Sequence, residues 1–471
     1  MSSTIPRTNS DASLASSPRT PSSSSSSSGS GIHFAPAASF PSPMSTTSRS
    51  TARRRPARLW RKTHAHPDDL NARTPWFDTP VGKSTLRKTR WTCLGFSSPG
   101  LLSAAALIVT AWLSVPKHEY CLVLNEQFDG DTLDSSIWHH EVQVGGFGNG
   151  EFEMTTTSPN NSYVEDGKLI IAPTLTSDRL GVDAITNGFV MNLTADGTCT
   201  SDKLSDCVAF SNSTVGNYSV IPPIQSARLT TRLSKFIRFG RVEVKAKMPT
   251  GDWIWPAIWM LPRDNVYGEW PASGEIDIVE TRGNRVKHSW DRTVNAIGSA
   301  LHWGLDFKSD RYKDTTGQFL LKRRYVDEAY YTYGLDWDPK GMRFWNNQRS
   351  RAIKRVNFDQ TFWDRGSLSS AQVNGSIAVN PWEASANVAK AAPFDQDFYL
   401  ILSVAVGGTN GWFPDSGDKP WSNGAPNAAR DFWNNRAKWQ ETWPEDPKER
   451  GMTVESVKIW RIKEKGETCA A

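Results

Sequence analysis

The series of short β-rich stretches between Cys121 and Ile462 constrains the fold of this 471-residue chain more than any other feature. Apolar β-formers alternate with polar residues, and Gly, Pro, Asn and Asp separate the stretches, as in GRVEVKAKMP (240–249) and GEIDIVE (274–280). A period of two is typical of half-buried strands, and no helix-period stretch of any length interrupts the series. The pattern therefore predicts one all-β domain over residues 120–469, a β-sandwich or jelly roll.

Charge is distributed unevenly along the chain. Residues 1–93 carry 14 Lys or Arg against 4 Asp or Glu, whereas the whole chain has a net charge of only +5, so the remainder is acidic. This composition excludes a globally basic nucleic-acid-binding protein. Residues 1–90 are rich in Ser, Pro, Thr and Arg, which predicts a disordered basic tail; a localised nucleic-acid-binding patch is the less favoured alternative.

A stretch of 26 residues without a charge, Trp91–Pro116, follows this tail. Residues 94–115 reach the length of about 20 residues that spans a bilayer, so we expect a transmembrane helix there. Basic residues at 87–90 precede the span, and the positive-inside rule then places the N-terminus in the cytoplasm, as in a single-pass type II signal anchor. A buried core helix is one alternative. A cleavable signal peptide is another, although such peptides normally lie within about the first 30 residues.

Sequons and cysteines both favour a lumenal or extracellular location for the β-rich domain. Five N-x-S/T sequons follow the apolar stretch and none precedes it; they begin at Asn160, Asn192, Asn212, Asn217 and Asn374. Four of the five cysteines also lie beyond it, an even number that suits an oxidising compartment. Cys199 and Cys207 flank a short polar loop and are expected to pair, which leaves Cys121 and Cys469 to join the two ends of the domain. Four free thiols are the alternative, and the spacing does not suggest zinc.

Three acidic residues lie close together in WPASGEIDIVETRGN (270–284). On a regular strand Glu275 and Asp277 share a face, whereas Glu280 points to the other face. Either Glu280 is then a costly unpaired charge behind the sheet, or a β-bulge near residues 278–279 absorbs one residue. We expect the bulge, because bulges recur beside active sites, and it places all three carboxylates on one face.

Crowding of these carboxyl groups raises the pKa of at least one, so that a protonated acid and an ionised nucleophile can coexist near neutral pH. With the bulge, the two Glu Cα atoms are expected about 13 Å apart, and inward-leaning side chains bring the carboxyl groups to about 5–6 Å. This separation is typical of a retaining rather than an inverting glycosidase. An acidic solvent face on a half-buried strand is the alternative, since a bare E-x-D-x-x-E pattern often arises by chance.

The segment and its surroundings resemble glycoside hydrolase family 16, in the bulged form typical of laminarinase-like β-1,3-glucanases. The resemblance covers most of the β-rich domain and includes NEQFDG (125–130), GGFGNGEFE (145–153), SARLTT (226–231), FGRVEVKAKMPTG (239–251), WPAIWMLP (255–262), LHWG (301–304), YTYGLDW (331–337), LILSVAVGGTNGWFPD (400–415) and VKIWRI (457–462). It implies a concanavalin A-like β-jelly-roll with a sugar cleft on its concave sheet. It further implies that Glu275 is the nucleophile, Glu280 the acid/base and Asp277 the assisting carboxylate, roles that spacing alone does not assign.

The mechanism implied is double displacement on a β-glucan with β-1,3 or mixed β-1,3/1,4 linkages. Glu280 protonates the leaving oxygen while Glu275 attacks the anomeric carbon, and Glu280 then activates water or a sugar hydroxyl. No organic cofactor is required. The resemblance also implies sugar contacts through three aromatic and three polar side chains, namely Trp255, Trp270, Trp421, Asn149, Arg228 and His302. Core packing for the tryptophans, a surface ion pair for Arg228 and a structural role for His302 remain alternatives.

Other members of the family often hold a structural calcium, and Glu126 and Glu455 match its ligand positions approximately. Glu455 replaces the usual Asp, and Ser403 stands where the family usually has Asn. Polar insertions at 176–223 and 308–324 enlarge the domain.

Three functions therefore compete. The first is a membrane-anchored endo-β-1,3-glucanase. The second is a cell-wall transglycosylase or assembly factor, because the anchor and tail resemble fungal β-1,6-glucan synthesis-associated proteins. The third is a non-catalytic β-glucan-binding protein, a class that characteristically loses the acids retained here.

Overall fold

The computed structural model describes residues 79–114, 117–216, 218–285, 293–370, 372–373, 376–383 and 390–469. The chain divides into two compact units, Met1–Ala106 and Leu107–Ala471. Most of the segment predicted to be a disordered tail, residues 1–78, lies outside the described residues, as do the sequon asparagines Asn217 and Asn374.

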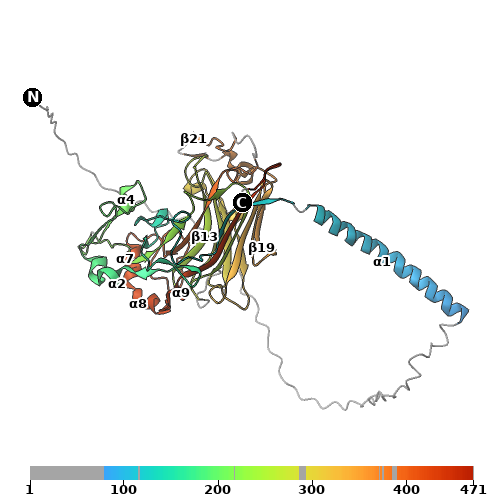
Figure 1. The fold of residues 1–471 in the computed structure, drawn as a ribbon, viewed down its shortest axis with the longest axis horizontal. Coiled ribbons are helices and arrows are strands. Elements are labelled where there is room, and N and C mark those ends of the chain that lie inside the picture. The colour runs from blue at the N-terminus through green and yellow to red at the C-terminus, as the bar shows by residue number, and fades with distance from the viewer. Residues whose placement is uncertain are drawn as a thin grey trace, which may run out of the picture. The chain divides into compact units, whose positions relative to one another are not determined.

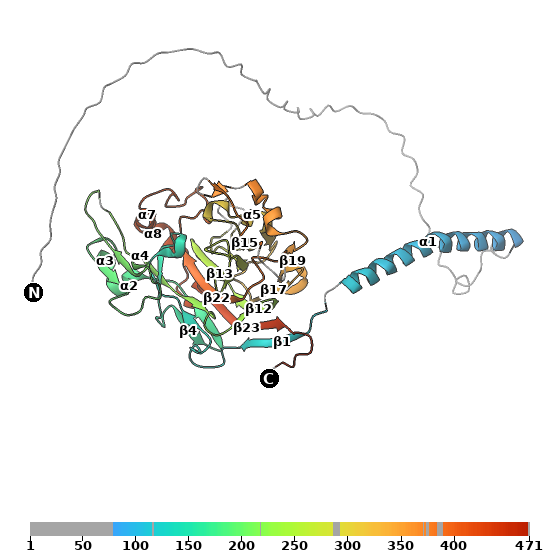
Figure 2. The ribbon, with the colours of Figure 1, turned by 90° about the horizontal axis from the view of Figure 1, so that it is seen from above.

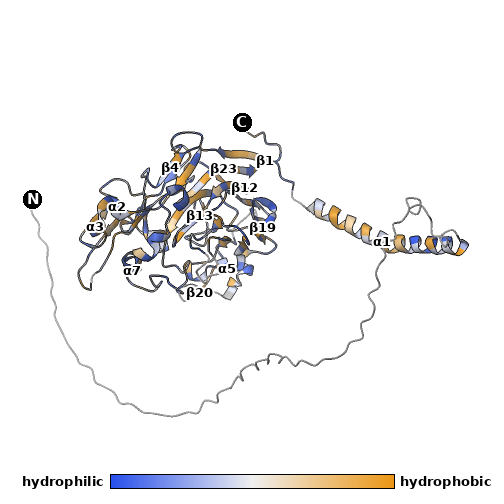
Figure 3. Ribbon diagram, turned by 90° about the horizontal axis from the view of Figure 1, so that it is seen from below, coloured by the Kyte–Doolittle hydropathy of each residue, from blue (hydrophilic) through white to orange (hydrophobic). Residues whose placement is uncertain are grey.

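The helix α1 spans Pro80–Ser114 and begins earlier than the sequence predicted. Residues 80–90 were expected to be part of the disordered tail, but they form the first turns of this helix. Pro80 suits a first helical position, and the Thr79 hydroxyl accepts a hydrogen bond from the Gly82 N–H at 3.0 Å, which caps the helix. The helix is long and apolar enough to cross a membrane by length and composition, a test that a signal sequence also passes. Its C-terminal half is the more hydrophobic one (Figure 3).

Two eight-stranded antiparallel sheets form the second unit (Figures 1 and 2). The supporting sheet has the order β19 (Gln348–Asn357), β18 (Gly341–Asn346), β17 (Tyr331–Asp338), β12 (Gly240–Lys247), β23 (Met452–Ile462), β5 (Lys168–Ile171) and β4 (Ser162–Glu165), with β1 (Tyr120–Glu126) also on β23. The pocket sheet has the order β16 (Gly317–Leu320), β15 (Ala296–His302), β14 (Glu275–Glu280), β13 (Ile254–Pro262), β22 (Phe398–Val406), β10 (Arg228–Thr230) and β2 (His139–His140), with β11 (Phe236–Ile237) also on β22.

The main core lies between the two sheets. Buried and half-exposed residues alternate along β12, so Val242 and Val244 face the core and the charged residues between them do not. Every residue of β22 is buried, and Leu400 and Leu402 pack in the same cluster as Val242. Full burial of one such side chain stabilises the fold by about 1.5–3 kcal/mol, so the alternating pattern read from the sequence is also what holds the sandwich together.

Shorter elements fill the connections. They are β3 (Glu153–Thr155), β6 (Thr174–Leu175), α2 (Thr176–Leu180), α3 (Val182–Thr186), β7 (Val190–Asn192), α4 (Leu204–Cys207), β8 (Val208–Phe210), β9 (Ile224–Ser226), α5 (Tyr312–Thr315), α6 (Phe362–Arg365), β20 (Gln372–Val373), β21 (Ser376–Ile377), α7 (Ala428–Asn434), α8 (Arg436–Trp439), α9 (Pro447–Arg450) and the 3-10 turns η3 (Gly146–Gly148), η4 (Phe307–Ser309), η5 (Leu368–Ser370) and η6 (Gln440–Thr442). Among the described residues from 117 to 469, no helix is longer than the seven residues of α7.

Two disulfides join the cysteines that were expected to pair. Cys121 on β1 is bonded to Cys469, and Cys199 is bonded to Cys207. The loop closed by Cys199 and Cys207 belongs to the first polar insertion and lies against residues 142–144: the Val144 N–H donates to the Asp206 carbonyl at 2.7 Å. The disulfides indicate a secreted or extracellular domain.

Candidate active site

The strand β14 carries the three acidic residues between β13 and β15. In its pairing with both neighbours the register shifts by one residue between Asp277 and Glu280. Ile278 and Val279 are both fully buried in the main core. Because this bulge absorbs one residue, Glu280 returns to the face that carries Glu275 and Asp277, and the bulge predicted at 278–279 is confirmed.

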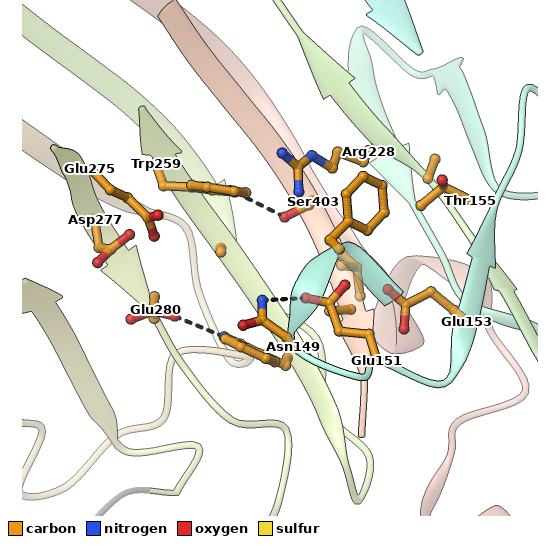
Figure 4. Close-up of a pocket in the computed structure, with 16 residues that line it drawn as sticks. Asn149, Glu151, Glu153, Thr155, Arg228, Trp259, Glu275, Asp277, Glu280 and Ser403 are labelled. Carbon is orange, nitrogen blue, oxygen red and sulfur yellow. Dashed lines mark hydrogen bonds between the residues drawn. The ribbon is translucent and has the colours of Figure 1, made fainter. Parts of the chain in front are cut away.

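All three carboxyl groups line one pocket on the pocket sheet (Figure 4). Its aromatic lining consists of Phe147, Trp255 and Trp259, and its polar lining includes Asn149, Arg228 and Ser403. Carboxyl groups, hydrogen-bonding side chains and flat rings are the groups with which proteins hold a neutral sugar, whose ring faces are apolar and whose edges carry hydroxyls.

Two tryptophans hold the two glutamates. The Trp270 indole N–H donates to Glu275 Oε2 at 2.6 Å, and the Trp255 indole N–H donates to Glu280 Oε1 at 3.0 Å. Trp270 is 38% exposed, whereas Trp255 is buried and stacks on Trp412 with ring centroids 5.0 Å apart. Trp270 therefore offers an open ring beside Glu275, while Trp255 fixes the orientation of Glu280.

A second chain of contacts runs behind Asp277. His302 Nε2 lies 3.3 Å from Asp277 Oδ2, and His302 Nδ1 lies 2.6 Å from Asp310 Oδ2. Tyr312 stacks on the imidazole at 5.0 Å. His302 thus bridges two carboxylates, a contact that holds Asp277 in place, and it is not among the residues that line the pocket.

Burial governs the protonation of this group. Burial, together with the neighbouring Asp277 carboxylate, raises the pKa of Glu275 to about 8, although His302 and Trp270 oppose the shift. Burial and the Glu280 carboxylate raise the pKa of Asp277 to about 6. Burial lowers the pKa of His302, but its bonds to Asp277 and Asp310 outweigh this and hold that pKa well above its usual value. Near neutral pH the Glu275–Asp277 pair therefore holds a proton beside a cationic imidazole.

Of the predicted sugar contacts, Asn149, Arg228 and Trp255 line the pocket. Arg228 is ion-paired with Glu141, and its guanidinium carbon lies 4.1 Å from the Phe147 ring centroid. An ion pair was the alternative to a sugar contact for Arg228, and this ion pair is present. Both of its side chains are largely buried rather than on the surface.

Trp421 is corrected from a sugar contact to a core residue. It is 4% exposed, packs edge-on against Phe152 and donates its indole N–H to the Gly408 carbonyl at 2.8 Å. The sequence could not distinguish it from an exposed tryptophan, because the turn that buries it depends on contacts distant in the chain.

The two carboxylates predicted by resemblance to hold calcium have other partners in this structure. Glu126 accepts hydrogen bonds from the Phe128 N–H at 2.8 Å and the Trp138 indole at 3.4 Å. Glu455 is ion-paired with Lys245 at 2.6 Å. Both carboxylates already have donors, and the ammonium group would repel a divalent ion.

Several contacts at the site were missed by the sequence analysis. Glu151 and Glu153 line the pocket opposite β14, Trp412 supports Trp255, and Asp310 supports His302. Glu151 and Glu153 share the i, i+2 spacing of Glu275 and Asp277, which is a usable signal. Asp310 lies in a polar insertion, where nothing in the sequence indicates a partner.

Comparison with known proteins identifies the class. Residues 190–396 match Glycosyl hydrolases family 16. The chain is 41% identical over 353 residues to a beta-1,3-glucan-binding protein of Penaeus monodon, covering 73% of this chain and 90% of that protein. It therefore belongs to glycoside hydrolase family 16.

Its relatives include both binding proteins and enzymes. A glucan endo-1,3-beta-glucosidase of Cryptopygus antarcticus is 28% identical over 316 residues, covering 66% of this chain and 87% of that protein. The laminarinase catalytic domain of Thermotoga petrophila RKU-1 superposes with a TM-score of 0.45 and 21% identity, covering 74% of this chain and 100% of that one.

Proposed function

We propose that this protein binds β-1,3-glucan in the pocket of the pocket sheet. The observation that carries the proposal is the lining itself: indole rings, carboxyl groups and a guanidinium on the pocket sheet, with an amide from the loop before β3. Two relatives that the chain spans almost completely are named for β-1,3-glucan, one as a binding protein and one as a glucosidase, so the sugar chain is what they share.

Laminarin binding by the full chain tests this proposal. We expect saturable binding, and we expect Trp270→Ala to weaken it about tenfold because the exposed ring beside Glu275 is lost. Trp460→Ala is the matched control, since Trp460 lies on β23 of the supporting sheet. Absence of laminarin binding by the wild-type chain would overturn the proposal.

Hydrolysis by a retaining mechanism is the second candidate, favoured by the bulge that turns three carboxyl groups into one pocket. In this candidate mechanism Glu280 is the acid/base, and Glu275 becomes the nucleophile once its proton has passed to the neighbouring Asp277, which also holds its orientation. The deglycosylation step passes the sugar to water or to another sugar hydroxyl, so a cell-wall transglycosylase shares the same first step.

Laminarin incubated with labelled oligosaccharide acceptors separates these activities. Released reducing ends support hydrolysis, longer labelled products support transfer, and binding with neither supports a non-catalytic glucan-binding protein. Glu275→Gln is expected to abolish either reaction while leaving laminarin affinity nearly intact.

We also propose that α1 is a type II anchor with the sandwich on the lumenal or extracellular side. The length of the apolar segment, the basic residues before it and the sequons after it support this topology. Glycosidase treatment should increase electrophoretic mobility, and the shift should disappear when all five sequon asparagines are mutated. A wild-type chain without any shift would contradict the topology.

A further inference from the structure

A second pair of carboxyl groups faces the first across the pocket. Glu151 lies just before β3 and Glu153 is the first residue of β3, and both are on the opposite side of the pocket from Glu275, Asp277 and Glu280 (Figure 4). None of the roles proposed above uses them. Glu153 is only 2% exposed, and Glu151 is half-buried.

Local hydrogen bonds fix both side chains. Glu153 accepts the Val406 N–H at 2.8 Å and is hydrogen-bonded to Glu151. Glu151 accepts the Asn149 amide at 2.8 Å, and Asn149 accepts the Asn410 amide at 3.0 Å. The pair therefore belongs to a network that joins its own segment to the turn after β22, and it cannot swing out of the pocket freely.

Gly150 allows this segment to lie close to the turn that follows β22. Gly150 has a φ of +63°, and a Cβ atom there would collide with the Thr409 side chain. The two acids are thus held against the pocket by the backbone as well as by hydrogen bonds.

Acidic side chains outnumber basic side chains in the lining of the pocket. Five of the sixteen lining residues are acidic, and Arg228 is the one basic residue among them. The Arg228 guanidinium is already paired with Glu141 and lies between the Phe147 and Trp259 rings. Burial and the Glu151 carboxylate raise the pKa of Glu153 well above its usual value, so Glu153 holds a proton, and the Glu275–Asp277 pair holds another. The three remaining acidic side chains still outnumber the one guanidinium that lines the pocket.

We infer that Glu151 and Glu153 form a second, hydrogen-bonding carboxyl pair that makes the pocket selective for uncharged glucan chains over chains carrying sulfate or carboxylate groups. Sugar hydroxyls donate hydrogen bonds to carboxylates, whereas an anionic substituent meets like charge, and the one basic side chain among the lining residues is already paired with Glu141. The inference rests on the proposed glucan binding and adds the chemical class of chain that the site accepts.

Three ligands with the same backbone test the inference on the full chain: laminarin, laminarin bearing neutral acetyl groups and laminarin bearing sulfate groups at equal substitution. Binding is followed by tryptophan fluorescence immediately after mixing. We expect the sulfated chain to bind more weakly than the acetylated chain, and the difference to shrink when NaCl rises from about 0.05 M to about 0.5 M.

Glu151→Gln is expected to reduce the acetylated-to-sulfated affinity ratio about fivefold, because one negative charge leaves the pocket while the amide oxygen can still accept from Asn149. Glu464→Gln removes an exposed charge that does not line the pocket and should leave the ratio unchanged. Equal binding of the two substituted chains, or an unchanged ratio in Glu151→Gln, would overturn the inference even when laminarin binds. Failure of laminarin itself to bind would instead overturn the proposed function.

Discussion

The carboxylates of β14 and those of β1 and β23 make an instructive comparison, because the sequence marked both sets as functional. Glu126 and Glu455 are satisfied by a backbone N–H, an indole and a lysine. The β14 acids are crowded against one another, and two indoles and one imidazole lie against their carboxyl groups. Acidic residues become a chemical site when the fold leaves their charge incompletely compensated at a pocket, and they remain structural where ordinary donors compensate it.

The largest expected effect concerns turnover. Glu280→Gln should lower the rate of reducing-end release from laminarin by about 10²–10⁴-fold, because the leaving oxygen loses its proton donor. Glu455→Gln, an identical change on β23, should leave this rate unchanged. Equal rates of reducing-end release in the two variants would remove the distinction between the two sets of acids. If the wild-type chain binds laminarin but does not cleave it, the pocket is a binding site only.

A smaller effect is expected in the dependence of stability on pH. Because the pKa of Glu275 is raised from 4.5 to about 8 in the folded chain, the unfolded chain loses this proton first as pH rises. The folded state is therefore progressively destabilised between those two pH values, a penalty that glutamine does not carry. At pH 8.5 the free energy of unfolding of Glu275→Gln should exceed that of wild type by on the order of 1–3 kcal/mol, seen as a higher unfolding temperature, and the two should match near pH 4. A stability difference independent of pH would contradict the raised pKa.

The smallest effect is expected at β23. Glu455→Gln should cost at most about 1 kcal/mol of unfolding free energy, since the Lys245–Glu455 pair is partly exposed and screened by solvent. Added calcium should not raise the melting temperature of the wild-type chain. A calcium-dependent increase that Glu455→Gln abolishes would show that the lysine is displaced and that the two sets of acids are more alike than their contacts indicate.

Local patterns predicted much of this molecule. The alternation of apolar and polar residues predicted the strands. The bulge was predicted because Glu275 and Glu280 are an odd number of residues apart, so a regular strand would place them on opposite faces. The predicted start of α1 lay too far along the chain. The prediction relied on apolar residues, whereas the helix begins after the cap at Thr79 with turns that are not apolar. Trp421, Trp412 and Asp310 could not be placed, because their partners are brought near only by the arrangement of both sheets and their connecting loops.

The bond between Cys121 and Cys469 gives the sandwich a mechanical property. Cys121 lies on β1, which pairs with β23, so both ends of the domain are fastened at one corner. A pull applied at residue 117 reaches this covalent crosslink before it reaches the rest of the domain. Tension between the N-terminal side of the chain and a polymer held in the pocket would therefore be shared at that corner between β1 and the end of the chain, and the disulfide would keep β1 from being stripped off β23.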